Sequence, residues 1–287
     1  MKRNHKLISI AALVSAMALS GWVLPACSAK KDGNVFNETD VTEGEGNNNT
    51  GTGSEGSSQD VSKPETPEIE MPQPQPAKAQ YVSVTASGVN LRSGAGTNYF
   101  AMGTAEKNTL YAIYGRQGDW YMTYYKNKPV YINANYCTVV QMSKNANEDV
   151  EKVITEGYKY MGVTYVYGAT RYHDGTGKKL AGFTTSAFDC SSLMQYIFKI
   201  GADVNLQVTT RTQVVQGKTV SKNDLQRGDL MFFTNSTRKD KVGVERIGHV
   251  ALYLGNNYIL HTASDYAKIE QISSTRWSYY IQSQRML

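Results

Sequence analysis

One cysteine and two histidines, each in a different local setting, limit what the second half of this chain can form. Cys190 opens an apolar stretch with helical spacing. His249 and His261 instead lie in short apolar runs that are typical of β-strands. A thiol at the start of a helix, with imidazoles on later strands, predicts an α+β domain in which helices pack on an antiparallel sheet.

Local patterns give the boundaries of these elements. Asn147 is expected to cap a first helix, whose apolar residues between Val150 and Met161 fall on one face. The second helix is predicted to begin at Cys190 and to stop at Gly201. Its buried face is expected to comprise Leu193, Met194, Ile197, Phe198 and Ile200. Strands are predicted over 230–233, 249–254 and 258–261.

This arrangement suits a thiolate nucleophile. A helix N-terminus lowers the pKa of a thiol, a neighbouring imidazole can take its proton, and a third polar group can hold that imidazole. Other interpretations remain open: Cys190 as an inert core thiol, His249 as a buried hydrogen-bonded imidazole, and His261 as a solvated residue at a strand end. Zinc ligation by the three side chains is a further alternative, although the chain has no Cys-x-x-Cys pair.

The N-terminal residues 1–26 are interpreted as a secretory signal. Three basic residues precede an apolar run over 7–19 that is too short to span a bilayer comfortably. Residues 24–27 resemble a bacterial lipobox, which predicts that Cys27 is lipid-modified; the alternative is plain cleavage near Ala26. Residues 27–78, rich in Gly, Asn, Ser and Pro, are expected to be a disordered linker, either a stalk above a membrane or a spacer without an anchor.

Charge is distributed unevenly along the chain. The net charge of the first 27 residues is +3, and that of the acidic linker is −6. Since the whole chain has a net charge of +5, residues 79–287 have a net charge of +8. A basic folded part on an exported chain suits an anionic envelope polymer. Export argues against nucleic acid, and no glycine-rich phosphate loop is present.

Residues 79–142 contain short β-runs separated by turns, which predicts a small all-β barrel. Residues 89–94 (Val-Asn-Leu-Arg-Ser-Gly) and 118–121 (Gly-Asp-Trp-Tyr) resemble a bacterial SH3 domain, a module that implies targeting to the cell wall. Residues 129–131 replace the Gly-Trp of that family. Cys137 is expected to be a buried strand residue.

Residues 148–287 resemble the NlpC family of papain-like cell-wall cysteine peptidases. The match rests on an ordered set of blocks: 165–168, 188–192, 211–212, 228–233, 248–255 and 261. The resemblance implies that Cys190 is the nucleophile, that His249 is the general base and that His261 orients it. It also implies that Tyr165, Asp189 and Ser191 contact the substrate, although Asp189 can serve as a helix cap.

This chain departs from the family pattern at five positions, all in turns or packing: Thr164, Tyr167, Ala169, Ser192 and Arg227. A polar insertion around His173, before Cys190, is either a lid over the cleft or a surface loop. No metal and no organic cofactor are expected.

The resemblance implies a peptidoglycan hydrolase that cuts an amide in the stem peptide, between D-γ-glutamate and the diamino acid. The expected partners are stem peptides, the cell wall and, through Cys27, a membrane; a monomer in the cell envelope is expected, with plain secretion as the alternative. Two other functions stay open. One is an amidase or acyl transferase on the same scaffold, and the other is a non-catalytic wall-binding lipoprotein.

Overall fold

The computed structural model describes residues 78–287. The predicted signal, the lipid site at Cys27 and the linker lie outside the described residues. Within 78–287, no helix has both the length and the apolar character that a membrane crossing requires.

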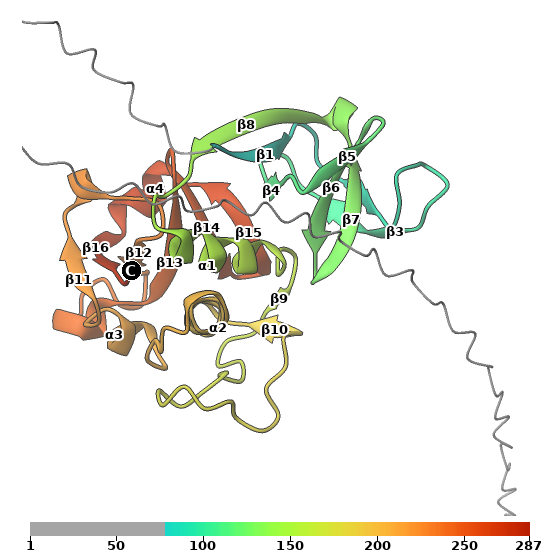
Figure 1. The fold of residues 1–287 in the computed structure, drawn as a ribbon. Helices are drawn as coiled ribbons and strands as arrows, with labels where there is room; N and C mark the ends of the chain where they lie inside the picture. Colours follow the sequence, from blue (N-terminus) through green and yellow to red (C-terminus); the bar gives the residue numbers. More distant parts are fainter. Residues whose placement is uncertain (1–77) are drawn as a thin grey trace, which may run out of the picture. The chain divides into compact units, whose positions relative to one another are not determined.

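The first part of the described chain is an all-β domain of two sheets (Figure 1). One sheet has the order β3-β2-β7-β6-β5, and β8-β1-β4 forms the edge of the other. Inward residues alternate with outward ones, as Val130 and Ile132 of β7 illustrate. The strands are β1 (Lys78–Val84), β2 (Val89–Arg92), β3 (Ala101–Ala105), β4 (Leu110–Ala112), β5 (Gly115–Gln117), β6 (Trp120–Tyr125), β7 (Lys128–Asn133) and β8 (Cys137–Ser143).

The second part places two main helices against antiparallel strands. Helix α1 (Glu148–Tyr158) begins as predicted, because the side chain of Asn147 accepts a hydrogen bond from the Asp149 N–H and three acidic residues occupy the first turn. Helix α2 (Cys190–Ala202) packs against α1 and the sheet. The remaining elements are β9 (Thr164–Tyr165), β10 (Ala187–Phe188), α3 (Thr210–Gln213), β11 (Lys218–Val220), β12 (Leu230–Phe233), β13 (His249–Gly255), β14 (Tyr258–Ala263), β15 (Tyr266–Gln271), α4 (Ser274–Ser278) and β16 (Tyr280–Arg285).

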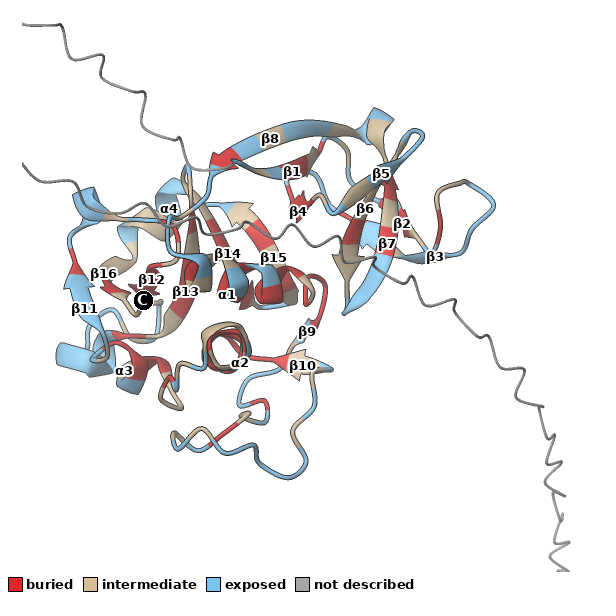
Figure 2. Ribbon diagram, in the orientation of Figure 1, coloured by how far each residue is buried: buried red, intermediate tan, exposed pale blue. Residues whose placement is uncertain are grey.

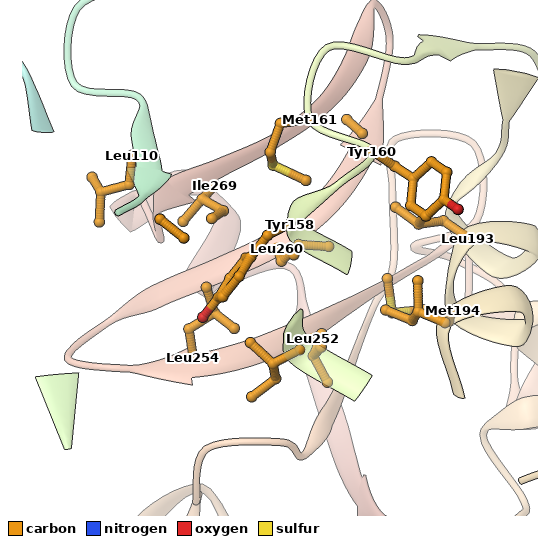
Figure 3. Close-up of a cluster of buried hydrophobic side chains, with 14 of the residues drawn as sticks. Leu110, Tyr158, Tyr160, Met161, Leu193, Met194, Leu252, Leu254, Leu260 and Ile269 are labelled. Atoms are coloured by element: carbon orange, nitrogen blue, oxygen red, sulfur yellow. The ribbon is translucent and has the colours of Figure 1, made fainter. Parts of the chain in front are cut away.

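The main sheet runs in the order β11-β16-β12-β13-β14-β15-β4-β1-β8, so strands of both parts share it. The junction is a single residue pair, Leu110 of β4 opposite Ile269 of β15. Figure 2 shows buried residues concentrated where helices meet the sheet, and Figure 3 shows Leu260, Leu252 and Met194 among the side chains of this core. The predicted α+β class, with helices on an antiparallel sheet after a small β domain, is confirmed.

The prediction that the second helix stops at Gly201 was wrong, both in the position of the helix end and in the role given to the glycine. The helix continues through Gly201 to Ala202, and its C-cap is Asp203, which adopts the left-handed conformation with φ of 54°. Gly201 is needed for close packing instead, since a Cβ there would lie 2.5 Å from the Cα of Val153 on α1. Ile200, which we expected on the buried face, is 45% exposed.

The insertion before Cys190 is packed rather than a loose surface loop. Its His173 is fully buried, and the backbone N–H of His173 donates to Gln195 of α2 at 3.2 Å. Phe183 of the insertion stacks on Tyr196 of α2, and Tyr172 packs edge-on against the same ring. Aromatic packing of this kind offsets the entropy of ordering a long loop. Cys137 opens strand β8 and is only half-buried, where full burial was expected.

Candidate active site

A capping box places Cys190 at the first position of α2. Asp189 is the N-cap: its Oδ1 accepts from the backbone N–H of Ser192 at 2.8 Å. In return the Ser192 hydroxyl accepts from the Asp189 N–H at 2.8 Å. Ser192, one of the departures from the family pattern, therefore completes the cap. The helix start that the sequence predicted at Cys190 is confirmed.

The thiol itself is more shielded than a helix N-terminus suggests. Cys190 is 8% exposed, and burial, followed by the charge of Asp189, raises the pKa of its thiol to about 12. Hydrogen bonding from the backbone of Val250 and of Ser191 acts in the opposite direction on this pKa. The expectation of a lowered thiol pKa was wrong, because the helix N-terminus acts on a desolvated group beside a carboxylate.

This shielding predicts how the thiol reacts with iodoacetamide. Since the reactive form is the thiolate, Cys190 is expected to label slowly at neutral pH, and the rate is expected to rise about tenfold per pH unit between pH 7 and 10. Mass spectrometry of the Cys190 peptide measures the rate separately from Cys137. The urea-unfolded protein is the control, in which both cysteines label as free thiols. Faster labelling of native Cys190 at pH 6 than at pH 8 would contradict the neutral thiol.

The two histidines meet across neighbouring strands and continue to a third residue. Nε2 of His249 on β13 lies 2.9 Å from Nδ1 of His261 on β14. Nε2 of His261 lies 3.0 Å from Oε1 of Glu270 on β15. A carboxylate only accepts, so Nε2 of His261 carries the proton it donates, and its Nδ1 accepts from Nε2–H of His249. This leaves Nδ1 of His249 unprotonated.

Glu270 is held as a carboxylate at the end of this chain of hydrogen bonds. Nη2 of Arg276 lies 3.0 Å from its Oε1, and Nζ of Lys268 lies 3.7 Å from Oε2. Although burial acts against ionisation, the hydrogen bond from His261 and these cations lower the pKa of Glu270 to about 2. Burial lowers the pKa of His249 well below its usual value, and His261 and Arg276 add to the effect. Burial also lowers the pKa of His261, and the hydrogen bond to Glu270 acts against that shift.

The thiol opens into a cleft of about 360 Å³. Tyr165 lies beside the thiol: burial first, and then the charge of Cys190, raise the pKa of its hydroxyl. Tyr167, at the rim, is 84% exposed. The lining comprises Tyr165, Tyr167, Gly168, Arg171, Asp189, Cys190, Ser191, Thr209, Thr210, Arg211, Asn235, Thr237, Arg238 and Gly248.

Arg171 of the insertion fixes the wall of the cleft next to the thiol. Its Nη2 lies 2.8 Å from Oδ2 of Asp189 and 3.2 Å from the hydroxyl of Ser191. That hydroxyl donates to Oδ1 of Asp189 at 3.0 Å, and the Gly168 N–H donates to Oδ2. Asp189 thus both caps α2 and anchors the insertion. Sequence reasoning missed Arg171, because a lone arginine in a polar insertion carries no pattern.

The structure therefore brings most of the predicted site residues together. Tyr165, Asp189, Cys190 and Ser191 line one cleft, and His249 pairs with His261. Glu270 was missed, although its alternation with buried Ile269 on β15 is a strand pattern that could have placed it. Over residues 78–287, no group of three or more His, Cys, Asp or Glu side chains is arranged to hold a metal ion.

Comparisons with known proteins bear on both parts. Residues 162–286 match the NlpC/P60 family, and residues 87–137 match the bacterial SH3 domain. The chain is 31% identical over 145 residues to the peptidoglycan DL-endopeptidase CwlO of Bacillus licheniformis, covering 50% of this chain and 29% of that protein. It is 29% identical over 136 residues to the peptidoglycan endopeptidase RipA of Mycolicibacterium smegmatis, covering 47% of this chain and 25% of that one. The chain thus spans under a third of the length of these two relatives.

Solved structures give similar but partial matches. The peptidoglycan hydrolase RipB of Mycobacterium tuberculosis is 27% identical, with a TM-score of 0.38, and the match covers 48% of this chain and 65% of that one. RipD of the same organism, described as a non-catalytic NlpC/p60 domain protein, is 24% identical, with a TM-score of 0.38, over 49% of this chain and 99% of that one. The two family matches alone give the domain content: residues 87–137 match a bacterial SH3 domain, and residues 162–286 match a domain of the NlpC/P60 family.

Proposed function

We propose that this protein is a peptidoglycan hydrolase that cuts an amide in the stem peptide, between D-γ-glutamate and the diamino acid, through the thiol of Cys190. The observation that carries the proposal is the hydrogen-bonded series His249–His261–Glu270, which leaves Nδ1 of His249 unprotonated. The backbone of the next residue, Val250, acts on the Cys190 thiol and favours a lower pKa. The relatives named as peptidoglycan endopeptidases support the choice of substrate.

In the proposed mechanism, thiol and imidazole are both neutral before the substrate binds, since burial disfavours each charged form. As the sulfur attacks the carbonyl carbon, Nδ1 of His249 takes the thiol proton. The backbone N–H of Cys190, with the Tyr165 hydroxyl as a second donor, faces the developing oxyanion. The imidazolium then protonates the leaving amine, and water hydrolyses the thioester with His249 again as base.

His261 and Glu270 serve this cycle as positioning residues. Each time His249 becomes an imidazolium, the Glu270 carboxylate, two hydrogen bonds away, stabilises the positive charge through His261. The series also fixes the tautomer, so that the unprotonated nitrogen of His249 is available for the thiol proton. No metal ion and no organic cofactor enter this mechanism.

Substrate contacts and location belong to the same proposal. Tyr165, Asp189 and Ser191 contact the peptide from one side of the thiol, where they line the cleft. The protein acts as a monomer in the cell envelope, with Cys27 as its lipid anchor and residues 27–78 as its stalk. The SH3 domain, over 79–142, holds the peptidase domain, over 148–287, against the wall.

Mass spectrometry of purified muropeptides after incubation with the full protein tests the proposal, with Cys190→Ala as the control. We expect fragments split after D-glutamate that the Cys190→Ala protein does not produce. Thiol-dependent cleavage at a different amide would replace the proposed bond and favour the amidase or acyl transferase. Retention on wall material without cleavage would overturn the hydrolase in favour of a wall-binding protein.

The pH dependence of activity distinguishes Glu270 from a merely structural residue. Glu270→Gln keeps an acceptor for His261 but removes the negative charge, so the pKa of His249 is expected to fall further. Since His249 must be unprotonated to act, the acid limb of kcat/KM should move to lower pH, while kcat falls about tenfold. Rates between pH 4 and 9 measure both effects. Asp265→Asn, which removes an exposed carboxylate from the same hairpin, is the control and is expected to leave the pH profile unchanged. If the acid limb of Glu270→Gln did not shift, Glu270 would not act on the pKa of His249.

A further inference from the structure

Two arginines that make no contact with Asp189 line the cleft. Arg211 is on α3, and Arg238 is on the segment 234–248 that joins β12 to β13. The third arginine of the lining, Arg171, is already neutralised by its ion pair with Asp189. Arg211 and Arg238 therefore supply the positive charge of the cleft that no aspartate of the lining neutralises.

A single carboxylate bridges these two arginines. Oε1 of Glu245 lies 3.3 Å from Nε of Arg211, and its Oε2 lies 3.1 Å from Nη1 of Arg238. Arg238 also donates to the backbone carbonyl of Glu245 at 2.8 Å, which holds its guanidinium in place. The arginine side chains are 31% and 22% exposed, whereas that of Glu245 is 59% exposed. The cationic partners are thus fixed in the cleft wall, and the anionic partner reaches in from solvent.

We propose that Arg211 and Arg238 form a carboxylate-binding subsite, which Glu245 occupies in the free protein and a carboxylate of the substrate occupies in the complex. An ion pair whose acidic partner is solvent-exposed is weak, so displacing Glu245 costs little. A substrate carboxylate enters a cleft that the substrate itself closes to water, where the same two guanidinium groups bind it more strongly.

The identity of the carboxylate rests on the proposed function. In a stem peptide linked through the γ-carboxyl of D-glutamate, the α-carboxyl of that residue remains free unless it is amidated. Diaminopimelate adds a second free carboxylate at the end of its side chain, and lysine does not. Both groups have the chemistry that a pair of guanidinium ions recognises. The subsite therefore selects peptides with a free carboxylate on one of the two residues that the scissile bond joins.

The position of the subsite couples binding to the reaction. The segment that carries Arg238 and Glu245 ends at Gly248, and the next residue is His249. Gly248 lines the cleft, and its N–H donates to the carbonyl of Phe233 at 2.9 Å, which fixes the end of the segment. A carboxylate bound at Arg211 and Arg238 is thereby held at a set distance from the reacting groups.

Three synthetic peptides test the proposal and distinguish the two sources of carboxylate. The reference contains D-glutamate and diaminopimelate; the second has the D-glutamate α-carboxyl amidated; the third has lysine in place of diaminopimelate. We expect the wild type to cleave the reference with a kcat/KM about tenfold higher than that of whichever peptide lacks the recognised group. Arg238→Gln is expected to remove that preference through KM, and Glu245→Gln to lower KM for the reference peptide.

Arg246→Gln is the matched control, because it removes a positive charge from the same segment at an exposed residue outside the cleft lining. Equal cleavage of all three peptides by the wild type, or the same preference in Arg238→Gln as in Arg246→Gln, would overturn the subsite while leaving the hydrolase intact. Calorimetric titration of the Cys190→Ala protein with the peptides separates the subsite from the hydrolase. If binding depends on the carboxylate and is abolished by adding Arg238→Gln, the subsite is supported even if the wild type cleaves nothing.

Discussion

Replacing His249 with glutamine is expected to lower kcat for stem-peptide hydrolysis by about 10³-fold, within the range of roughly 10² to 10⁴ that a positioned acid–base group contributes. The effect is large because burial raises the pKa of the Cys190 thiol to about 12, so that another group must remove its proton. Glutamine can hydrogen-bond to His261 but cannot carry a proton between sulfur and leaving amine. The residual rate should rise with pH, as the thiolate fraction does.

Rates of peptide release between pH 6 and 10 measure this loss. His173→Gln is the control, since it removes a fully buried imidazole of the insertion, whose Nδ1 accepts from the Gly175 N–H. We expect its kcat to stay within about twofold of the wild type. If folded His249→Gln retained more than a tenth of wild-type kcat, His249 would not be the base, and the series through His261 to Glu270 would be structural.

Replacing Arg227 with methionine is expected to destabilise the protein by about 3–5 kcal/mol, as breaking a buried ion pair does. Arg227 is 6% exposed, and its Nε and Nη2 lie 2.6 and 3.0 Å from the two carboxylate oxygens of Glu151. It also donates to the Leu254 carbonyl at 2.9 Å and to the Tyr158 hydroxyl at 2.8 Å. Its loss leaves the Glu151 carboxylate, only 17% exposed, without its cation.

Thermal unfolding of the variant should show a Tm about 10 °C below that of the wild type, given roughly 2–4 °C per kcal/mol for a protein of this size. The double variant Arg227→Met, Glu151→Met is expected to recover most of the loss, because no unpaired charge remains buried. Arg116→Gln, which breaks the exposed pair with Asp119, should leave Tm unchanged. A double variant no more stable than Arg227→Met would show that packing, not charge, is lost.

The elements that the sequence predicted well are those with local signals. Asn147 before an apolar face and Asp189 before Cys190 are caps that act within four residues, so the starts of both helices followed from the sequence. The strands at 230–233 and 249–254 have continuous apolar runs that admit few alternatives. The cysteine and the two histidines were identified through their motifs, and the structure places His249 and His261 in contact.

What the sequence did not predict depends on contacts between distant residues. Glu270, Arg171 and Glu245 act through partners 9, 18 and 34 residues away, at His261, Asp189 and Arg211, and no local pattern records such a pairing. The raised pKa of Cys190 follows from burial by the whole fold, which outweighs the helix terminus. Gly201 looked like a helix end because its role, close approach to Val153, is visible only when α1 is in place.

The sheet that passes from β15 to β4 has an evolutionary consequence. Ile269, which pairs with Leu110, directly precedes Glu270, so the strand that supports the histidines is bordered by the β domain. Gene fusion that attached this peptidase to a different N-terminal module would expose that strand edge and disturb the carboxylate beside it. Substitutions at positions 110 and 269 should therefore covary among descendants of this two-domain architecture.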